Sequence, residues 1–403
     1  MGMELAILRK YFKWALFNFF ILSLAGLFLR FLLIHPVNEI NYQYFLHAHS
    51  HFAFSGWGFM ALSILLSHSF IPKKIIEGRS FRKLLWLSLI PAYGMLLSFP
   101  FKGYFSISIA FSTLFIIVNI WFVLLFFKAT KQQPRTLSLQ TARLALIFLG
   151  LSSLGPFALG PVMASGQGGS PLYFNVIYYY LHFQYNGWMS LGIISLLLKW
   201  IEQQDKSSSK KNDQLCYFLL LISIVLTYAL SLLWNKPANA YYIIGGGAAV
   251  LQCAAFFLLF KKLPIDQLRS LPTLQRTILL IALLAFAVKA GMQLFSAFPF
   301  FADLAYKIRY LIIGYLHLVF LGGFSFFVLF YSIHFGLIPH TRLLKYGIYL
   351  FFAGFFLSEF LLFTESLFSI FNLHIPHFQT VLFIVSLALP PSCLALWLTA
   401  EKK

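Results

Sequence analysis

The sequence predicts an all-α, polytopic membrane protein of about twelve transmembrane helices in three pseudo-symmetric four-helix units. The chain of 403 residues is 60% hydrophobic and only 10% charged, a balance that excludes a soluble globular protein. Its apolar runs reach the roughly 20 residues that a helix needs to cross a bilayer. A short histidine motif also recurs at intervals close to one third of the chain. These three observations predict the architecture.

Charged and Pro/Gly-rich breaks divide the chain into candidate spans. They lie near residues 13–34, 44–70, 83–100, 105–128, 140–165, 173–200, 215–234, 240–261, 273–297, 306–335, 343–365 and 375–400. The first span follows a basic stretch, as a signal peptide does, but no small-residue cleavage site follows it, and we expect a retained helix. We expect one membrane domain over residues 1–403, with pseudo-repeats at approximately 13–128, 140–261 and 273–400.

The net charge of +19 is explained by its distribution. With the N-terminus inside, the outward loops hold only Arg30, Lys102, Lys236, Lys307 and Arg309, while Lys289 lies within a helix. The remaining Lys and Arg residues fall on the inward side, which is the positive-inside pattern of an even number of spans. We therefore expect both termini in the cytoplasm of a bacterial-type inner membrane. The lipid bilayer is the expected partner, and the basic character requires no nucleic acid.

The repeated motif begins at a histidine in the second helix of each predicted unit. It reads "HFAFSGW" from His51, "HFQYNGW" from His182 and "HLVFLGG" from His317, with separations of 131 and 135 residues. All three helices run from outside to inside, and each histidine follows its helix start by a similar distance. At about 1.5 Å per residue the three histidines therefore share one depth.

The first motif is preceded by two more histidines, in "YFLHAHSHFAFSGWGFM". His47 and His51 are four residues apart and share a helix face, whereas His49 points roughly the opposite way. Membrane histidines either hydrogen-bond a neighbouring helix and hold the bundle together, or ligate a metal such as iron or copper. Ionisable groups in a membrane are functional candidates by default. The pattern leaves open which of the three histidines would ligate.

These motifs resemble the haem-copper oxidase catalytic subunit and its relatives, which include the nitric oxide reductases and the twelve-helix haem proteins of nitric oxide response. "HAHSHFAFSGWGF" is similar to the helix-two motif of that superfamily, and "YLHLVFLGG" to its helix-ten motif. The resemblance implies twelve helices in three arcs and a low-spin haem b. One axial ligand would be His47, His49 or His51, and the other would be His317. His182 would occupy the region of a copper ligand.

The chain departs from the superfamily pattern at three places. The seventh span, "LCYFLLLISIVLTYALSLLW", has no histidine, so the paired copper ligands are missing. Tyr315 replaces the histidine that would hold a second, gas-binding haem, and it is either a ferric haem ligand or a packing residue. Asn186 stands where oxidases have a tyrosine four residues after the helix-six histidine. A complete oxygen reductase is therefore not expected, and oxidoreductase activity stays open.

Four further polar residues have functional and structural interpretations. Arg309 precedes His317 by eight residues, and it would either pair with a haem propionate or snorkel to lipid headgroups. Lys289 and Glu359 lie mid-helix, and they would form either a buried ion pair or part of a proton path. Gln293 shares a helix face with Lys289 and would extend such a path.

The sequence therefore predicts a haem-binding membrane protein for electron transfer or for response to nitric oxide or a similar gas. An electron donor or further membrane subunits would be its partners. The first alternative is a proton-coupled metal or small-solute transporter that uses the membrane histidines, although threefold repetition is not typical of many transporter folds. The second is a haem-free relative that keeps the bundle and its histidines.

Overall fold

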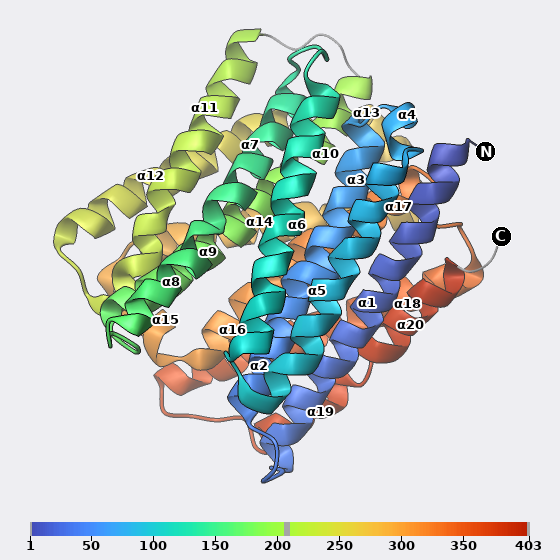
Figure 1. Cartoon of the computed structure of the whole chain (residues 1–403). Coiled ribbons are helices and arrows are strands. Elements are labelled where there is room, and N and C mark those ends of the chain that lie inside the picture. The colour runs from blue at the N-terminus through green and yellow to red at the C-terminus, as the bar shows by residue number, and fades with distance from the viewer. Residues whose placement is uncertain (1, 205–209, 401–403) are drawn as a thin grey trace. The chain divides into compact units, whose positions relative to one another are not determined.

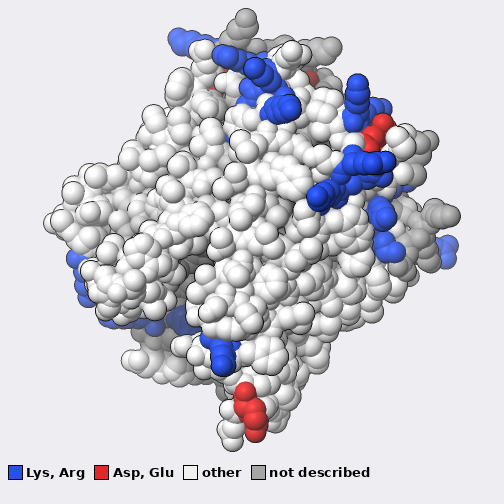
Figure 2. Space-filling view, viewed as in Figure 1, with Lys and Arg blue, Asp and Glu red and all other residues white. Residues whose placement is uncertain are grey.

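The computed structural model describes residues 2–204 and 210–400, and these form helices joined by short loops, with no strand among them (Figure 1). Eleven of the described helices are long and apolar enough to cross a membrane. The surface in Figure 2 is largely free of charged side chains. The prediction of an all-helical, polytopic membrane protein is therefore confirmed.

The chain divides into two compact units. Unit 1 contains Met1–Gln132 and Val328–Lys403. Its helices are α1 (Met3–Ile34), α2 (Tyr42–Phe52), η1 (Ala53–Phe59), α3 (Met60–Phe70), α4 (Lys73–Ile76), α5 (Arg79–Lys102), α6 (Ser106–Thr130), most of α17 (Phe326–His334), α18 (Arg342–Ile370), α19 (Phe378–Ser386) and α20 (Leu389–Thr399). Helix α1 packs on α20, which also packs on α18, so segments from both ends of the chain form one unit.

Unit 2 contains Gln133–Phe327. Its helices are α7 (Leu137–Ser152), α8 (Leu154–Ala164), α9 (Pro171–His182), η2 (Phe183–Met189), α10 (Ser190–Gln204), α11 (Lys210–Leu226), η3 (Thr227–Asn235), α12 (Asn239–Lys261), α13 (Ile265–Ser270), α14 (Thr273–Ser296), α15 (Pro299–Lys307), α16 (Arg309–His317) and η4 (Leu318–Ser325). Helix α7 packs on α10 and η2, while α14 packs on η4 and α12. The boundary between the units falls inside α17, so it does not coincide with a boundary of the predicted repeats.

The sixth predicted span, residues 173–200, is not among the eleven apolar helices. It is nevertheless helical without a break, because α9, η2 and α10 follow one another directly from Pro171 to Gln204. The polar side chains in its middle are buried: His182 is 1% exposed, Gln184 3% and Asn186 1%. The segment is thus less apolar than the others because it contributes polar groups to the interior of unit 2.

Capping residues fix where the first two histidine helices begin. The Asn41 side chain accepts a hydrogen bond from the Tyr44 N–H at the start of α2, at 3.2 Å. Ser170 does the same for the Tyr173 N–H at the start of α9, where Pro171 occupies the first helical position. Such side chains satisfy backbone donors that a helix leaves unpaired in its first turn. The caps therefore help to set the start of the helices that carry His47 and His182.

Candidate functional site

Each repeated histidine stands at the point where an α-helix changes into a π-helix. The π-helical segment η1 begins two residues after His51, η2 begins one residue after His182, and η4 begins one residue after His317. π-Helical turns are rare and occur frequently at functional sites. The repeat predicted from a short motif is therefore matched by a repeat in backbone conformation.

The second and third repeats agree in a side-chain bond as well. Ser190 and Ser325 each lie eight residues after the repeated histidine. Their hydroxyls donate to the carbonyls of Tyr185 and Phe320, five residues earlier, at 2.6 and 2.8 Å. A five-residue spacing is that of a π-helical turn, so both serines bond a carbonyl of the widened turn.

Aromatic stacking holds two of these π segments against a neighbouring helix. In unit 1, the Trp57 ring of η1 stacks on Phe19 of α1 with ring centroids 4.3 Å apart and planes 11° apart. In unit 2, Phe183 of η2 stacks on Phe148 of α7 at 5.3 Å and 8°. Aromatic pairs of this kind contribute about 0.5–1.5 kcal/mol beyond the apolar area that they bury. The π segments are therefore well packed, and the histidines beside them lie on fixed backbone.

Two of the three neighbouring histidines share a face of α2, as their spacing predicts. The ring of His51 stacks on Phe99 of α5 at 4.5 Å, and its Nε2 lies 2.9 Å from the Tyr104 hydroxyl. The ring of His47 lies edge-on to Tyr104 at 4.9 Å and 6.1 Å from Phe99. His47 and His51 therefore line one aromatic surface that belongs to unit 1.

His49 lies against a different helix. A Cβ atom built on Gly26 of α1 would lie 3.1 Å from Cε1 of the His49 ring. The glycine thus leaves the room that this imidazole uses between α1 and α2. The expectation that His49 points away from His47 and His51 is confirmed by these different neighbours.

The hydrogen bonds of these histidines bear on their fitness as haem ligands. An axial ligand must offer a ring nitrogen to the iron, and the Nε2 of His51 is hydrogen-bonded to Tyr104. For His47, only ring contacts are formed, so neither ring nitrogen has a hydrogen-bond partner within residues 2–204 and 210–400. His47 fits the role of an axial ligand better than His51, because His51 would have to release Tyr104.

His182 is the centre of a hydrogen-bond network inside unit 2. Its Nε2 lies 2.8 Å from the Ile224 carbonyl, which can only accept, so Nε2 carries the proton. Its Nδ1 then accepts from the Asn186 amide at 3.1 Å and from the Ser231 hydroxyl at 3.3 Å. Both ring nitrogens are thereby engaged. A copper or other metal ion at His182 does not fit this arrangement, because the ligating lone pair on Nδ1 already holds two donors.

The wider surroundings of His182 also lack the donors of a metal centre. Within the described parts of the chain, no three His, Cys, Asp or Glu side chains are grouped as a metal ion would require. The Asn186 Nδ2 donates to His182, so the Asn186 Oδ1 points away from the imidazole. That oxygen is buried and has no hydrogen-bond partner among the described residues. The network therefore serves polar packing or proton exchange better than metal ligation.

Lys289 lies in the same unit and is fully buried. Its Nζ donates to the Gln293 Oε1 at 2.9 Å, on the helix face that their spacing predicts. The remaining groups that act on its charge are His182 and Cys253. No carboxylate partners Lys289 among the described residues of the chain.

A second buried amide lies level with Lys289 on the neighbouring helix. Phe256 of α12 contacts Phe286 of α14, and a Cβ on Gly246 would meet Ala297, so the two helices run antiparallel. In this antiparallel arrangement, Gln252 of α12 lies one turn before Phe256. It is therefore at the same height as Ala290 of α14, the residue after Lys289. Gln252 is 3% exposed, and its Oε1 has no hydrogen-bond partner within the described chain. Unit 2 therefore has several buried polar atoms at the height of Lys289 along the helix axes.

The structure places Tyr315 and Glu359 beside partners of their own. The ring of Tyr315 in α16 lies edge to face with the ring of Tyr185 in η2, within unit 2, with ring centroids 6.3 Å apart. Ligation of a haem by Tyr315 stays a prediction. Glu359 of α18 belongs to unit 1, where the charge of Arg30 in α1 acts on it. The pairing of Lys289 with Glu359 stays a prediction.

The last two predicted residues frame α16. Arg309 is its first residue and is exposed, while His317 is its last residue, directly before η4, and is partly exposed. One residue that the sequence interpretation passed over is Asn18 of α1, which is fully buried. Its amide donates to the Gly56 carbonyl of η1 at 2.7 Å, and its Oδ1 accepts from the Tyr93 hydroxyl at 2.7 Å. The available signal was a lone asparagine within an apolar helix.

The chain was compared with known protein families and with curated proteins. No known protein family matches the chain, and no curated protein matches it.

Proposed function

We propose that this polytopic membrane protein binds haem b and uses it for electron transfer or for response to nitric oxide or a similar small gas. The observation that carries the proposal is the His47 face of α2. There, an imidazole whose ring nitrogens are not hydrogen-bonded within the described chain lies beside the aromatic rings of Phe99 and Tyr104. The repetition of a histidine before each of the three π segments gives further support.

In this proposal, His47 would bind the haem iron, and the resemblance of the helix-ten motif implies that His317 would bind it as well, while His51 would orient Tyr104 through their hydrogen bond. A haem with two imidazole ligands supplies a reversible one-electron couple without an open coordination position. Phe99 and Tyr104 would form the aromatic side of the site beside His47, and the hydrogen bond between the Tyr104 hydroxyl and His51 Nε2 would keep that nitrogen engaged. Copper at His182 forms no part of the proposal, because both nitrogens of that ring are hydrogen-bonded.

The proposed setting is a bacterial-type inner membrane with both termini in the cytoplasm. This orientation follows from the basic inward segments, such as "IPKKIIEGRSFRK". Since a bis-histidine haem needs a source of electrons, an electron donor or a further membrane subunit would act as partner.

Single histidine variants test the ligand assignment. We expect His47→Ala and His317→Ala to lose the haem absorption of the purified protein while both variants still insert into the membrane. His51→Ala should retain haem. His340→Ala is the matched control, because it removes an exposed histidine outside the repeated helices. Full haem content in both His47→Ala and His317→Ala would contradict the assignment.

A second candidate function, proton-coupled transport of a metal ion or small solute, is favoured by Lys289. A fully buried lysine with an amide partner and no described carboxylate is costly in a membrane interior. The pKa of lysine also shifts readily on burial, which allows a buried lysine to act as a base. Together with His182, it would take up and release a proton during transport.

Flux measurements separate the two functions. In proteoliposomes with an internal pH indicator, transport predicts that copper or zinc moves together with protons and that the purified protein is colourless. Lys289→Met should then abolish flux, whereas Lys261→Met, at the end of α12, should not. Metal-independent proton traces that are the same in both variants would exclude this candidate.

A further inference from the structure

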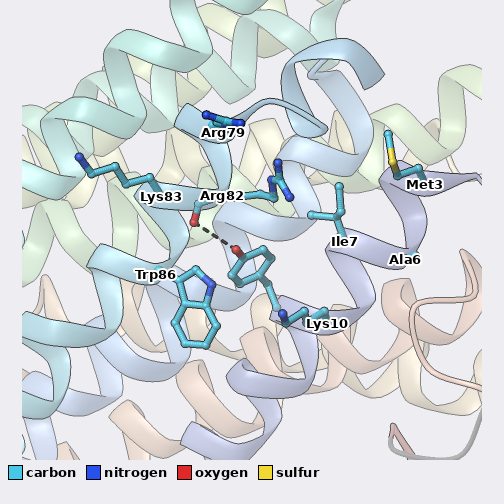
Figure 3. Close-up of a pocket in the computed structure, with 9 residues that line it drawn as sticks. Met3, Ala6, Ile7, Lys10, Arg79, Arg82, Lys83 and Trp86 are labelled. Atoms are coloured by element: carbon cyan, nitrogen blue, oxygen red, sulfur yellow. Dashed lines mark hydrogen bonds between the residues drawn. The ribbon is translucent and has the colours of Figure 1, made fainter.

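A basic pocket lies between the N-terminal ends of α1 and α5 in unit 1 (Figure 3). Its volume is about 540 Å³. The lining from α5 includes Arg79, Arg82 and Lys83, and the lining from α1 includes Lys10. Figure 3 shows Arg79 and Arg82 near one another at the start of α5, with Lys83 extending to the left from the same helix and Lys10 on α1. The pocket has no acidic lining residue.

The cations of the pocket have no acidic partners within the described chain. Lys10 places its Nζ 5.8 Å from the Trp86 ring, and no carboxylate pairs with Arg79, Arg82 or Lys83. The acidic side chains near the N-terminal ends of α1 and α5 interact with Lys73 instead. Glu4 lies 2.7 Å from the Lys73 Nζ, and the charge of Glu77 also acts on that lysine. The hydrogen bond and charge of Glu4 hold the pKa of Lys73 above its ordinary value.

The floor of the pocket is aromatic and fixed in place. The Tyr11 hydroxyl donates to the Arg82 carbonyl at 3.1 Å, which ties α1 to α5 (Figure 3). The rings of Tyr11 and Trp86 meet edge to face at 5.8 Å. Tryptophan and tyrosine of this kind are enriched where a membrane protein crosses the headgroup region. The pocket is therefore built at the polar end of two candidate membrane spans.

An apolar stripe continues from the pocket along α5. Trp86, Ile90 and Leu97 are 41%, 51% and 65% exposed, and their spacing places them on one helix face. Phe101 extends the same stripe and is 79% exposed. A helix face of this composition in a membrane protein contacts acyl chains. A molecule that fills the pocket and follows the stripe thus has an anionic head and an apolar tail.

We propose that this pocket binds the phosphate headgroup of an anionic phospholipid, whose acyl chains lie along Trp86, Ile90 and Leu97. Arginine side chains bind phosphate oxygens through two parallel hydrogen bonds, and lysines add charge. Basic pockets between transmembrane helices are typical binding places for such headgroups. A free phosphorylated metabolite shares the headgroup chemistry but has no acyl chain to contact the apolar stripe. The lipid is therefore the occupant that the whole surface fits.

The test measures lipid binding to the delipidated, detergent-purified full chain by native mass spectrometry. Phosphatidylglycerol is titrated against phosphatidylcholine. Arg79→Gln with Arg82→Gln removes two pocket charges, and Lys128→Gln with Lys131→Gln removes two exposed charges outside the pocket as the matched control. Because each basic residue near an anionic lipid surface contributes about 1 kcal/mol and about 1.4 kcal/mol is tenfold in affinity, we expect the variant that lacks two of them to bind phosphatidylglycerol about thirtyfold more weakly. The control should change less than twofold, and phosphatidylcholine binding should not change.

Three results would overturn the proposal. Equal losses in the pocket and control variants would show a general effect of charge. Equal affinity for the two lipids in the unaltered protein would exclude headgroup recognition. Displacement of phosphatidylglycerol by millimolar inorganic phosphate would assign the pocket to a soluble phosphate compound. Trp86→Ala provides a second variant with all charges kept, and it should weaken phosphatidylglycerol binding without making inorganic phosphate a competitor.

Discussion

Replacement of Asn18 by leucine should destabilise unit 1, because this buried side chain joins three helical segments. Its amide bonds the Gly56 carbonyl in η1, and its Oδ1 accepts from Tyr93 of α5. Leucine has a similar size and is apolar, so Asn18→Leu keeps the burial and removes both bonds. Side-chain hydrogen bonds in membrane proteins contribute about 0.6 kcal/mol on average and about 1.7 kcal/mol at most. Two such bonds predict a loss of about 1–3 kcal/mol in the free energy of unfolding.

Asn119 of α6 offers the matched control. It is also buried in unit 1, at 1% exposure, but it makes no hydrogen bond within the described residues, and its Oδ1 is buried. Asn119→Leu therefore removes a polar atom without a partner, which is neutral or stabilising. Unfolding in mixed micelles with increasing denaturing detergent, followed by tryptophan fluorescence, measures both variants. A double-mutant cycle of Asn18→Leu with Tyr93→Phe should further show a favourable coupling energy.

Two outcomes would refute this reasoning. One is an unchanged stability of Asn18→Leu, which would mean that the bond to η1 contributes nothing. The other is an equal loss in Asn119→Leu, which would mean that the burial of leucine at these depths is costly by itself.

Two further predictions concern unit 2. Gly187→Ala should lower the melting temperature, because the added Cβ would lie 2.6 Å from the Phe148 Cβ and overpacking costs about 1–3 kcal/mol. Gly150→Ala is the control and should be neutral or slightly stabilising, because a Cβ there would have no atom within 4 Å. Equal melting temperatures of the two variants would contradict the prediction. The hydrogen bond from Lys307 holds the pKa of Asp303 below its ordinary value of 3.8, so its contribution to stability is present above that value and is lost as the pH falls through the lowered pKa. Melting temperatures measured from pH 6 to pH 3 should therefore fall less steeply in Asp303→Asn, and parallel curves would sink the prediction.

Periodicity and composition were sufficient for the fold class and for the three histidine helices. Long apolar runs are strong local signals, and a spacing of four residues places His47 with His51, or Lys289 with Gln293, whatever the tertiary structure. The sixth span is the instructive case. Its polar residues around His182 lower its hydropathy, yet the charged and Pro/Gly-rich breaks on either side still delimited it, and the histidine motif then placed it within the repeat.

The π segments and the hydrogen-bond partners were beyond the sequence interpretation. No residue type marks a π-helical turn as proline marks a kink, and the widened turn at Gly56 is partnered by Asn18, which is 38 residues away. The carbonyl of Ile224 likewise comes from a separate helix, so the sequence could not tell that both nitrogens of His182 are engaged. The basic residues of the pocket between α1 and α5 were recognised only as a topology signal, because their convergence with Lys10 depends on the packing of α1 beside α5.

A reduced-minus-oxidised visible spectrum of the detergent-purified protein tests the central proposal most directly. The protein should come from cells with ample haem, and the haem should be quantified as its pyridine complex. Ligation by His47 and His317 predicts a sharp low-spin b-type spectrum near one haem per chain. A colourless protein under these conditions would contradict haem binding and leave the transport function of Lys289 and His182 as the one to pursue.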